Sequence, residues 1–181
     1  MAEWSRIARR IRVPLGFAFA AFYVWIARPT VASIVIGTLT ALPGILLRAF
    51  ASGHVKKNEA LATSGPYAHT RNPLYLGSFI MGVGFAIAAR SVWVFLLMVG
   101  MVFLIYVPVI RAEETFLRQT FPDFDEYAHH VPRLWPRWSA YGSAEGAFSR
   151  PLYWQHREYN ATLGTAALLA ALVAKLVWAS R

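Results

Sequence analysis

Long apolar segments alternate with polar, mostly basic segments along the whole chain. Five segments are nearly free of charge, with Lys175 as the one charged residue inside them, and they comprise 85 of the 181 residues. They are Val13–Ala27, Val31–Leu47, Leu74–Ala89, Val92–Ile110 and Ala161–Trp178. A helix needs roughly 17–25 apolar residues to cross the hydrocarbon core of a bilayer. The pattern therefore predicts about five transmembrane helices, although the first and third segments are short and would need flanking residues or a locally thinner bilayer.

The composition favours a membrane protein over a soluble one. Hydrophobic residues make up 57% of the chain and charged residues 15%, against about 45–50% and about 25% in soluble domains. A chain of this size cannot surround five apolar helices with polar helices of its own. The absence of cysteine excludes a disulfide scaffold, a thiolate metal site and a cysteine nucleophile.

The connections between the segments predict the topology. Only Arg28-Pro29-Thr30 separates the first two segments, and only Arg90-Ser91 separates the third and fourth. These short connections indicate two tight antiparallel hairpins followed by a C-terminal helix. We therefore expect an all-α polytopic membrane protein that forms a single domain over residues 1–181. A secretory signal peptide is the alternative for residues 1–27, but a second apolar segment follows almost at once without a convincing cleavage site.

The basic residues predict the orientation. The formal net charge is +9, and 14 of the 18 Lys and Arg residues lie in the N-terminal tail, in residues 48–73 or in residues 111–160. The excess of Lys and Arg in cytoplasmic loops places the N-terminus and both long polar segments in the cytoplasm. Because these residues flank the apolar segments, where they would meet anionic headgroups, we expect membrane lipids and not nucleic acid as partners.

The first polar segment contains a dense group of candidate binding residues. Gly65-Pro66 indicates a turn, and Asn72-Pro73 indicates a helix start with Asn as the cap. The free N–H groups of a helix start bind anionic groups, and Arg71 adds a full charge with bidentate geometry. Tyr67 and Tyr75 offer flat faces to a heterocycle. Anchoring of the chain at the membrane interface is the alternative for the tyrosines and the arginine.

Two adjacent carboxylates, Glu113 and Glu114, follow the fourth apolar segment. Glu114 and Arg118 have the i,i+4 spacing of a surface ion pair. Glu113 projects about 100° away from Glu114 on a helix and shares its side with Leu117. Glu113 is thus the better candidate for an inward-facing carboxylate, which could bind a ribose diol or balance a cation.

Three motifs occur in order: Gly-Pro-Tyr-x-x-x-Arg-Asn-Pro-x-Tyr-x-Gly from residue 65, Arg-x-Glu-Glu-x-x-Leu from residue 111 and Val-Pro-Arg-x-x-Pro from residue 131. Their combination resembles the isoprenylcysteine carboxyl methyltransferase and phospholipid methyltransferase superfamily, over roughly residues 48–136. Residues 1–47 and 150–181 match only as hydrophobic helices. Where eukaryotic members carry two histidines, this chain has Glu59 and Asn72, which leaves His54 and His69 as the nearby histidines.

The resemblance implies an S-adenosylmethionine-dependent integral membrane methyltransferase with a cytoplasmic cofactor pocket. Such an enzyme transfers the methyl group in line to a membrane-embedded or hydrophobic acceptor: an isoprenoid carboxylate, a phospholipid amine or a thiol. Arg111 matches the neighbourhood of a substrate-side arginine, and Glu114 is the candidate base for an amine or thiol. No metal is expected. The cofactor-binding residues that the resemblance implies are Leu61, Ala62, Tyr67, Arg71, Asn72, Pro73, Leu74, Tyr75 and Glu113.

The sequence is also compatible with two other functions. One is an NADPH-dependent membrane reductase of the sterol reductase type, which needs further basic residues for the 2′-phosphate and usually a longer chain. The other is a non-catalytic membrane protein, supported only by Glu59 and Asn72. Binding of S-adenosylmethionine, of NADPH or of neither cofactor separates the three functions. The oligomeric state is not predicted.

Overall fold

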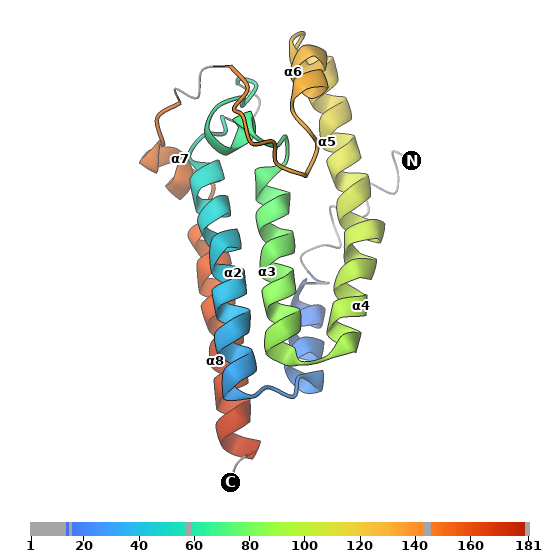
Figure 1. The fold of residues 1–181 in the computed structure, drawn as a ribbon, viewed down its shortest axis with the longest axis vertical. Helices are drawn as coiled ribbons and strands as arrows, with labels where there is room; N and C mark the ends of the chain where they lie inside the picture. Colours follow the sequence, from blue (N-terminus) through green and yellow to red (C-terminus); the bar gives the residue numbers. More distant parts are fainter. Residues whose placement is uncertain (1–13, 15, 57–58, 143–145, 180–181) are drawn as a thin grey trace.

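The computed structural model describes residues 14, 16–56, 59–142 and 146–179, and every regular element in that part of the chain is helical (Figure 1). The elements, in chain order, are a first helix over Gly16–Ile26, α2 (Val31–Ser52), the 3₁₀ turn η1 (Gly65–Ala68), α3 (Pro73–Ala89), α4 (Val92–Met101), the π-helical turn η2 (Val102–Tyr106), α5 (Val107–Thr120), α6 (Phe124–His130), α7 (Arg150–Gln155) and α8 (Tyr159–Ala179). The predicted all-α class is confirmed.

Three of these helices are long and apolar enough to cross a membrane: α2, the continuous helix Val92–Thr120 and α8. The first helix and α3 are apolar but shorter, as the sequence indicated. The helices thus indicate an integral membrane protein, whereas the five-span topology stays a prediction. The start of the first predicted segment, at Val13, lies outside the described residues.

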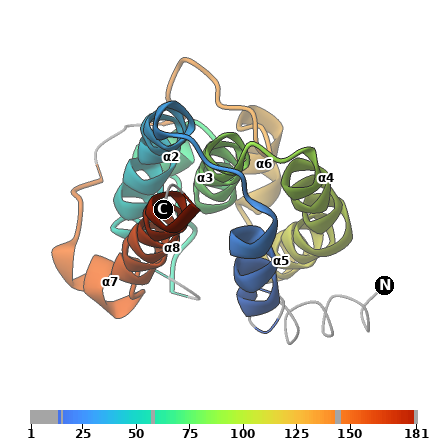
Figure 2. The same cartoon turned by 90° about the horizontal axis from the view of Figure 1, so that it is seen from below.

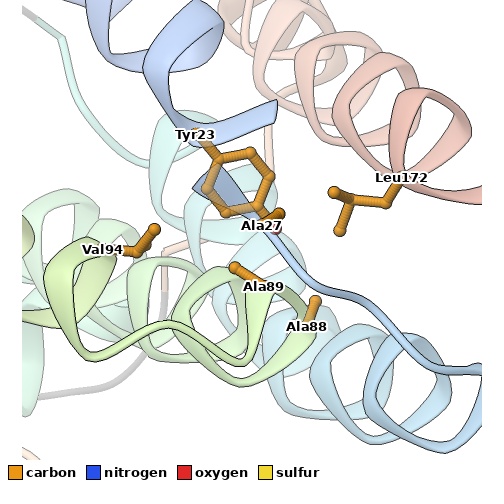
Figure 3. Close-up of a cluster of buried hydrophobic side chains, with 6 residues drawn as sticks. All are labelled: Tyr23, Ala27, Ala88, Ala89, Val94 and Leu172. Atoms are coloured by element: carbon orange, nitrogen blue, oxygen red, sulfur yellow. The ribbon is translucent and has the colours of Figure 1, made fainter. Parts of the chain in front are cut away.

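Both predicted hairpin connections lie at the same end of the molecule, opposite the loops that follow α2 (Figure 1). The Arg28 N–H donates to the Ala89 carbonyl at 2.9 Å, so the two connections lie side by side. Thr30 and Ser33 form a reciprocal capping box that starts α2. Six buried side chains close this end of the bundle, contributed by the first helix, α3, α4 and α8 (Figure 3): Tyr23, Ala27, Ala88, Ala89, Val94 and Leu172.

Helices α2 and α3 pack through small residues that let their backbones approach closely. A Cβ on Gly37 would lie 2.5 Å from the Gly84 carbonyl oxygen, and a Cβ on Gly44 would lie 2.5 Å from that of Gly77. Because the hydrophobic effect does not drive helices together in lipid, their association depends on close van der Waals packing, which small residues at the crossing allow. Pro43 lies inside α2 without interrupting it. The tight α2–α3 pair fixes the position of the loop that joins them.

The helix that starts at Val92 continues well beyond the predicted apolar segment, to Thr120. Residues 111–120 contain mostly good helix formers, and the helix ends just before Phe121, the residue that precedes Pro122. The π-helical turn of η2 comes immediately before Pro108, which has no N–H to donate. In Figure 1, α3 and this long helix meet at the Arg90-Ser91 connection and separate toward the opposite end.

Candidate functional site

A cavity of about 280 Å³ lies at the end of the bundle opposite the hairpin connections. Its walls come from residues 55, 56 and 60–62, the loop before α3, the start of α3, α5 and α6. Of the eleven residues singled out from the sequence, nine line it: Leu61, Ala62, Tyr67, Arg71, Asn72, Leu74, Tyr75, Glu113 and Glu114. Pro73 is buried at the start of α3 outside the lining, and Arg111 is exposed.

The loop before α3 is shaped by Gly65 and Pro66, which open the 3₁₀ turn η1 as the sequence predicted. Gly65 has φ +56, and a Cβ there would lie 2.6 Å from the imidazole of His54. Glycine is required on both counts, because other residues avoid this conformation and would collide with the ring. The turn places Tyr67 in the wall of the cavity.

Tyr67 is held by the segment that follows α5. Its carbonyl accepts a hydrogen bond of 2.7 Å from the Tyr127 hydroxyl. Burial raises the pKa of the Tyr67 phenol above its ordinary value, and the nearby Tyr127 and Glu113 raise it further. The phenol is therefore neutral at physiological pH. Within the described part of the chain its hydroxyl makes no hydrogen bond, so it is available to a ligand.

The rest of the loop is clamped by backbone hydrogen bonds to residues 132–141. Arg71 N–H donates to the Pro132 carbonyl at 3.0 Å, and Tyr141 N–H donates to the Ala68 carbonyl at 3.0 Å. Thr70 adds a side-chain hydrogen bond to the Leu134 carbonyl at 3.1 Å. The conformation of the loop thus depends on a segment more than 60 residues later in the chain.

Glu114 is a buried anchor and does not form the surface ion pair with Arg118 that its spacing predicts. Its Oε2 accepts hydrogen bonds from the Arg133 Nη2 at 2.6 Å and Nε at 2.9 Å. Its Oε1 accepts one from the Asn72 amide at 3.2 Å and lies 3.6 Å from the Arg71 Nε. Arg118 instead pairs with Asp125 on the surface. The i,i+4 prediction is wrong because two arginines distant in sequence, together with Asn72, reach Glu114 from the inner side of the helix.

Asn72 occupies the predicted cap position of α3, with Pro73 following in the first turn, but its side chain does not cap the helix. The amide donates to Glu114 and, at 3.0 Å, to the Arg133 carbonyl. This part of the prediction is corrected, since an acceptor on α5 and a backbone acceptor after α6 both compete for the amide. Asn72 therefore joins the start of α3 to α5 and to the segment after α6.

Arg71 is a cation of the cavity wall whose side chain has few protein partners among the described residues. Its side chain is 13% exposed, and its Nε is buried without a hydrogen bond within the described part of the chain. Within the same part of the chain, the 3.6 Å approach to Glu114 is the guanidinium's one ion pair, and it makes no hydrogen bond. Because an arginine offers five donors in a planar fork, this side chain retains the capacity to bind an oxyanion bidentately.

Glu113 and Tyr75 bring α5 and α3 together at the same cavity. The Tyr75 hydroxyl donates to the Glu113 Oε1 at 2.9 Å, and both residues line the wall. Glu113 lines the cavity on the side of Leu117, as expected. Its side chain is exposed, however, and Glu114 is the buried carboxylate of the pair, so burial does not favour Glu113 as the inward-facing one. The Tyr75 ring also packs edge-on against Tyr106, 5.8 Å between centroids, which supports this part of the wall.

The histidines near the motif have backbone partners and do not line the cavity. His69 Nδ1 lies 2.9 Å from the Arg137 carbonyl. His54 contacts the carbonyls of Phe50 and Gly146, both at 2.9 Å. These contacts match a structural role for the two side chains. Among the described residues, no group of three or more His, Cys, Asp or Glu side chains is placed to hold a metal ion.

Sequence reasoning overlooked several aromatic residues of the wall. Phe116, Phe121, Phe124 and Tyr127 line the cavity. Aromatic residues at such spacing along and between α5 and α6 are common in ordinary helix packing, so no sequence pattern distinguished them as site residues. Arg133 was recognised only as part of the third motif, although its pairing with Glu114 raises its pKa and holds the segment that clamps the loop.

Comparison with known proteins identifies the family. The sequence model of the phospholipid methyltransferase family matches residues 30–123, more than half of the chain. The chain belongs to the phospholipid methyltransferase family. The match covers α2, α3 and the long helix through Thr120, and so includes the start of α3 and both carboxylates of α5. Membership of this family implies a membrane methyltransferase.

Two curated relatives of this family member carry names from metal resistance. The nickel-cobalt-cadmium resistance protein NccN of Alcaligenes xylosoxydans xylosoxydans is 33% identical over 135 residues, 71% of this chain and 62% of that protein. The cobalt-zinc-cadmium resistance protein CzcN of Cupriavidus metallidurans is 40% identical over 86 residues, 48% of this chain and 40% of that protein. The chain thus spans less than two thirds of these relatives. No solved structure matches it.

Proposed function

We propose that this family member is an S-adenosylmethionine-dependent methyltransferase that modifies a membrane-embedded or hydrophobic acceptor. The observation that carries the proposal is the charge arrangement of the cavity. Arg71 lines it with a guanidinium whose buried Nε makes no hydrogen bond within the described residues, and Glu113 lines it from the long helix. A zwitterionic amino-acid group needs one cation and one anion or acceptor in the same pocket, and these two side chains supply them.

The lining fits the remaining parts of that cofactor. Arg71 would bind the carboxylate, because a guanidinium binds two oxygens in parallel. Glu113 would accept hydrogen bonds from the amino group or from ribose hydroxyls. The neutral Tyr67 phenol and the apolar side chains of Leu61 and Phe121 would surround the adenosine. When bound, S-adenosylmethionine supplies an electrophilic methyl group on its sulfonium.

The chain's own residues would contribute positioning and exclusion of water. A carboxylate acceptor needs no base, whereas an amine or thiol must lose a proton. Glu114 is occupied by Arg133 and Asn72, so we propose that it positions Arg71 and the clamping segment and does not act as the base. Arg111, exposed on the same helix, is a candidate contact for an acceptor at the membrane surface.

We also propose that the cavity faces the cytoplasm and that the enzyme acts in resistance to toxic metal ions. The distribution of Lys and Arg supports a cytoplasmic cavity. The relatives' names support a role in resistance to toxic metal ions, which a methyltransferase would exert by modifying a membrane component. A lipid or another hydrophobic acceptor is preferred to a metal ion, because the cavity lining offers arginine, tyrosine and aromatic side chains and no cluster of metal ligands within the described residues.

Transfer of a radioactive methyl group tests this function. The purified full-length chain in lipid nanodiscs is incubated with S-adenosylmethionine labelled in the methyl group and with three acceptor classes in turn: total bacterial lipid, a hydrophobic thiol and an isoprenoid carboxylic acid. We expect label in one organic-extractable product and none with Arg71→Ala, while Arg118→Ala retains activity. If no acceptor class is labelled while the folded protein binds NADPH, the reductase function replaces the methyltransferase function.

A further inference from the structure

A second cavity, of about 660 Å³, lies at the end of the molecule opposite the candidate site, where the two hairpin connections meet the last turns of α8. Figure 2 views the molecule from this end. Three cations line the cavity, Arg28, Arg90 and Lys175, and its lining contains no acidic side chain. The apolar part of the lining includes Ile26 and Leu176. The function proposed above uses none of these residues.

The two arginines are free to bind a ligand. Arg28 and Arg90 are exposed, and within the described residues neither guanidinium makes a hydrogen bond or an ion pair. The backbones that carry them are fixed relative to each other, because the Arg28 N–H donates to the Ala89 carbonyl at 2.9 Å. Two guanidinium groups that line one cavity match the several oxygens of a phosphate.

Arg90 also has an unfavourable backbone conformation. It ends α3 with φ +51 and ψ +40, a left-handed conformation that glycine adopts at much lower cost at a helix C-terminus. A non-glycine residue there is an outlier from which a functional role of the side chain can be inferred. A role for the guanidinium in binding accounts for arginine at this position.

Lys175 and neighbouring donors neutralise the backbone groups that would repel an anion. The Lys175 Nζ donates to the Val24 and Trp25 carbonyls at 2.7 and 2.6 Å, which covers the C-terminal end of the first helix. The last carbonyls of α3 also have donors, since Arg90 N–H donates to that of Ile87 and Ser33 Oγ to that of Ala88. Few carbonyl oxygens without a donor therefore remain near the two arginines to repel a bound anion.

The surroundings of the cavity indicate a lipid. Three tryptophans at this end of the bundle are largely exposed, Trp25 at 76%, Trp93 at 61% and Trp178 at 81%. Exposed tryptophan is typical of the membrane–water interface. A cavity that combines cations with apolar side chains suits a charged headgroup and the first methylenes of its acyl chains, whereas a free phosphate would use only the cations.

We propose that this cavity binds the phosphate of an anionic phospholipid from the leaflet opposite the candidate site, with Arg28 and Arg90 as the phosphate ligands. The site is separate from the methyl-transfer cavity, so the bound lipid would be a structural ligand of the hairpin end. It would hold together the two connections on which the packing of the first helix, α3 and α8 depends.

Lipid-dependent stability of the full-length chain tests the proposal. The thermal midpoint in uncharged detergent is measured with phosphatidylglycerol, with phosphatidylcholine and with inorganic phosphate. We expect phosphatidylglycerol to raise the midpoint of the wild type, and the concentration for half of the effect to increase at least tenfold in Arg28→Gln/Arg90→Gln. Arg118→Gln, at the other end of the long helix, should behave like the wild type. Native mass spectrometry should show one retained phosphatidylglycerol that the double variant loses.

Three results would overturn the proposal. Phosphatidylcholine carries the same phosphate, but its choline cation neutralises the headgroup, so equal stabilisation by this lipid would show that the site does not select an anionic phospholipid. Equal stabilisation by inorganic phosphate would show that no lipid is required. A phosphatidylglycerol response that is unchanged in the double variant would remove the two arginines from the site. If the double variant does not fold, Arg90→Gln alone is compared with Arg90→Lys, which keeps the charge but loses the bidentate fork and should bind phosphatidylglycerol with intermediate strength.

Discussion

Asn72 donates a hydrogen bond of 3.2 Å to Glu114, a residue 42 positions later in the chain, and so fastens the first turn of α3 to α5. The same amide donates to the Arg133 carbonyl, while the Arg133 guanidinium binds the other oxygen of Glu114. The start of α3, α5 and the segment after α6 therefore converge on one buried carboxylate. Much of the geometry of the candidate site depends on this residue.

Replacement of Glu114 by Gln should destabilise the protein more than replacement of any surface ion-pair partner. Glu114→Gln leaves the Arg71 and Arg133 guanidinium groups without a counter-charge, and breaking a buried pair costs about 3–5 kcal/mol. Because the Arg133 side chain is 45% exposed, the expected loss is smaller, about 2–3 kcal/mol. Denaturant unfolding in detergent measures it.

The matched control for that variant is Arg118→Gln on the same helix. Arg118 pairs with Asp125, and both side chains are exposed, at 53% and 69%. Such pairs contribute at most about 1 kcal/mol. Similar unfolding free energies for the two variants would show that Glu114 is not the anchor described here.

Alkaline pH should destabilise the fold through two buried phenols. Burial raises the pKa of Tyr67 and of Tyr127 above the ordinary value, so the unfolded chain loses these protons first. Stability is then fully present below about pH 10 and falls as pH rises above it, by about 1.4 kcal/mol per pH unit for each phenol. Unfolding free energies measured from pH 8 to pH 11 check the slope.

Tyr127→Phe separates the two phenols. It removes one titrating group, and it also removes the 2.7 Å hydrogen bond to the Tyr67 carbonyl. The variant should lose about 1–2 kcal/mol at pH 8, and its slope above pH 10 should become shallower by about 1.4 kcal/mol per pH unit, the contribution of one phenol. A slope that stays the same would mean that Tyr127 does not contribute to the alkaline transition.

Alanine at Gly37 should weaken the packing of α2 on α3. The new Cβ would lie 2.5 Å from the Gly84 carbonyl oxygen, a contact that the side chain cannot relieve by rotation. We expect a loss of about 1–3 kcal/mol. Gly100→Ala is the control, because no atom lies within 4 Å of a Cβ there, and it should be neutral or stabilising by up to about 1 kcal/mol. Equal effects in a thermal melt would contradict the close approach of the two backbones.

The helices were predictable from the sequence because their apolar segments are long and their connections short. The apolar pattern alone does not give the end of the helix that starts at Val92. The apolar segment ends at Ile110, where hydropathy indicates the end of lipid contact, but the helix continues through helix-forming polar residues to Thr120. The motif from residue 65 was predictable as a turn followed by a helix start, since Gly65 and Pro73 restrict the backbone locally.

The partners of Glu114 and Asn72 were not predictable in the same way. Spacing rules compare neighbours within one helix, so they favoured Arg118 for Glu114 and the helix end for Asn72. The actual partners lie 19 and 42 positions away from Glu114. In a buried site these distant contacts are stronger than the local ones, since an ion pair with little access to water is less screened than one on the surface.

Binding of S-adenosylhomocysteine tests the central proposal most directly. Calorimetric titration of the detergent-purified chain should give one site per chain with micromolar affinity. Arg71→Ala should weaken binding at least tenfold while its thermal unfolding stays cooperative, and Arg118→Ala should bind like the wild type. A folded wild-type protein that binds no S-adenosylhomocysteine, or an Arg71→Ala variant that binds it with unchanged affinity, would contradict the assignment of the cavity as the cofactor site.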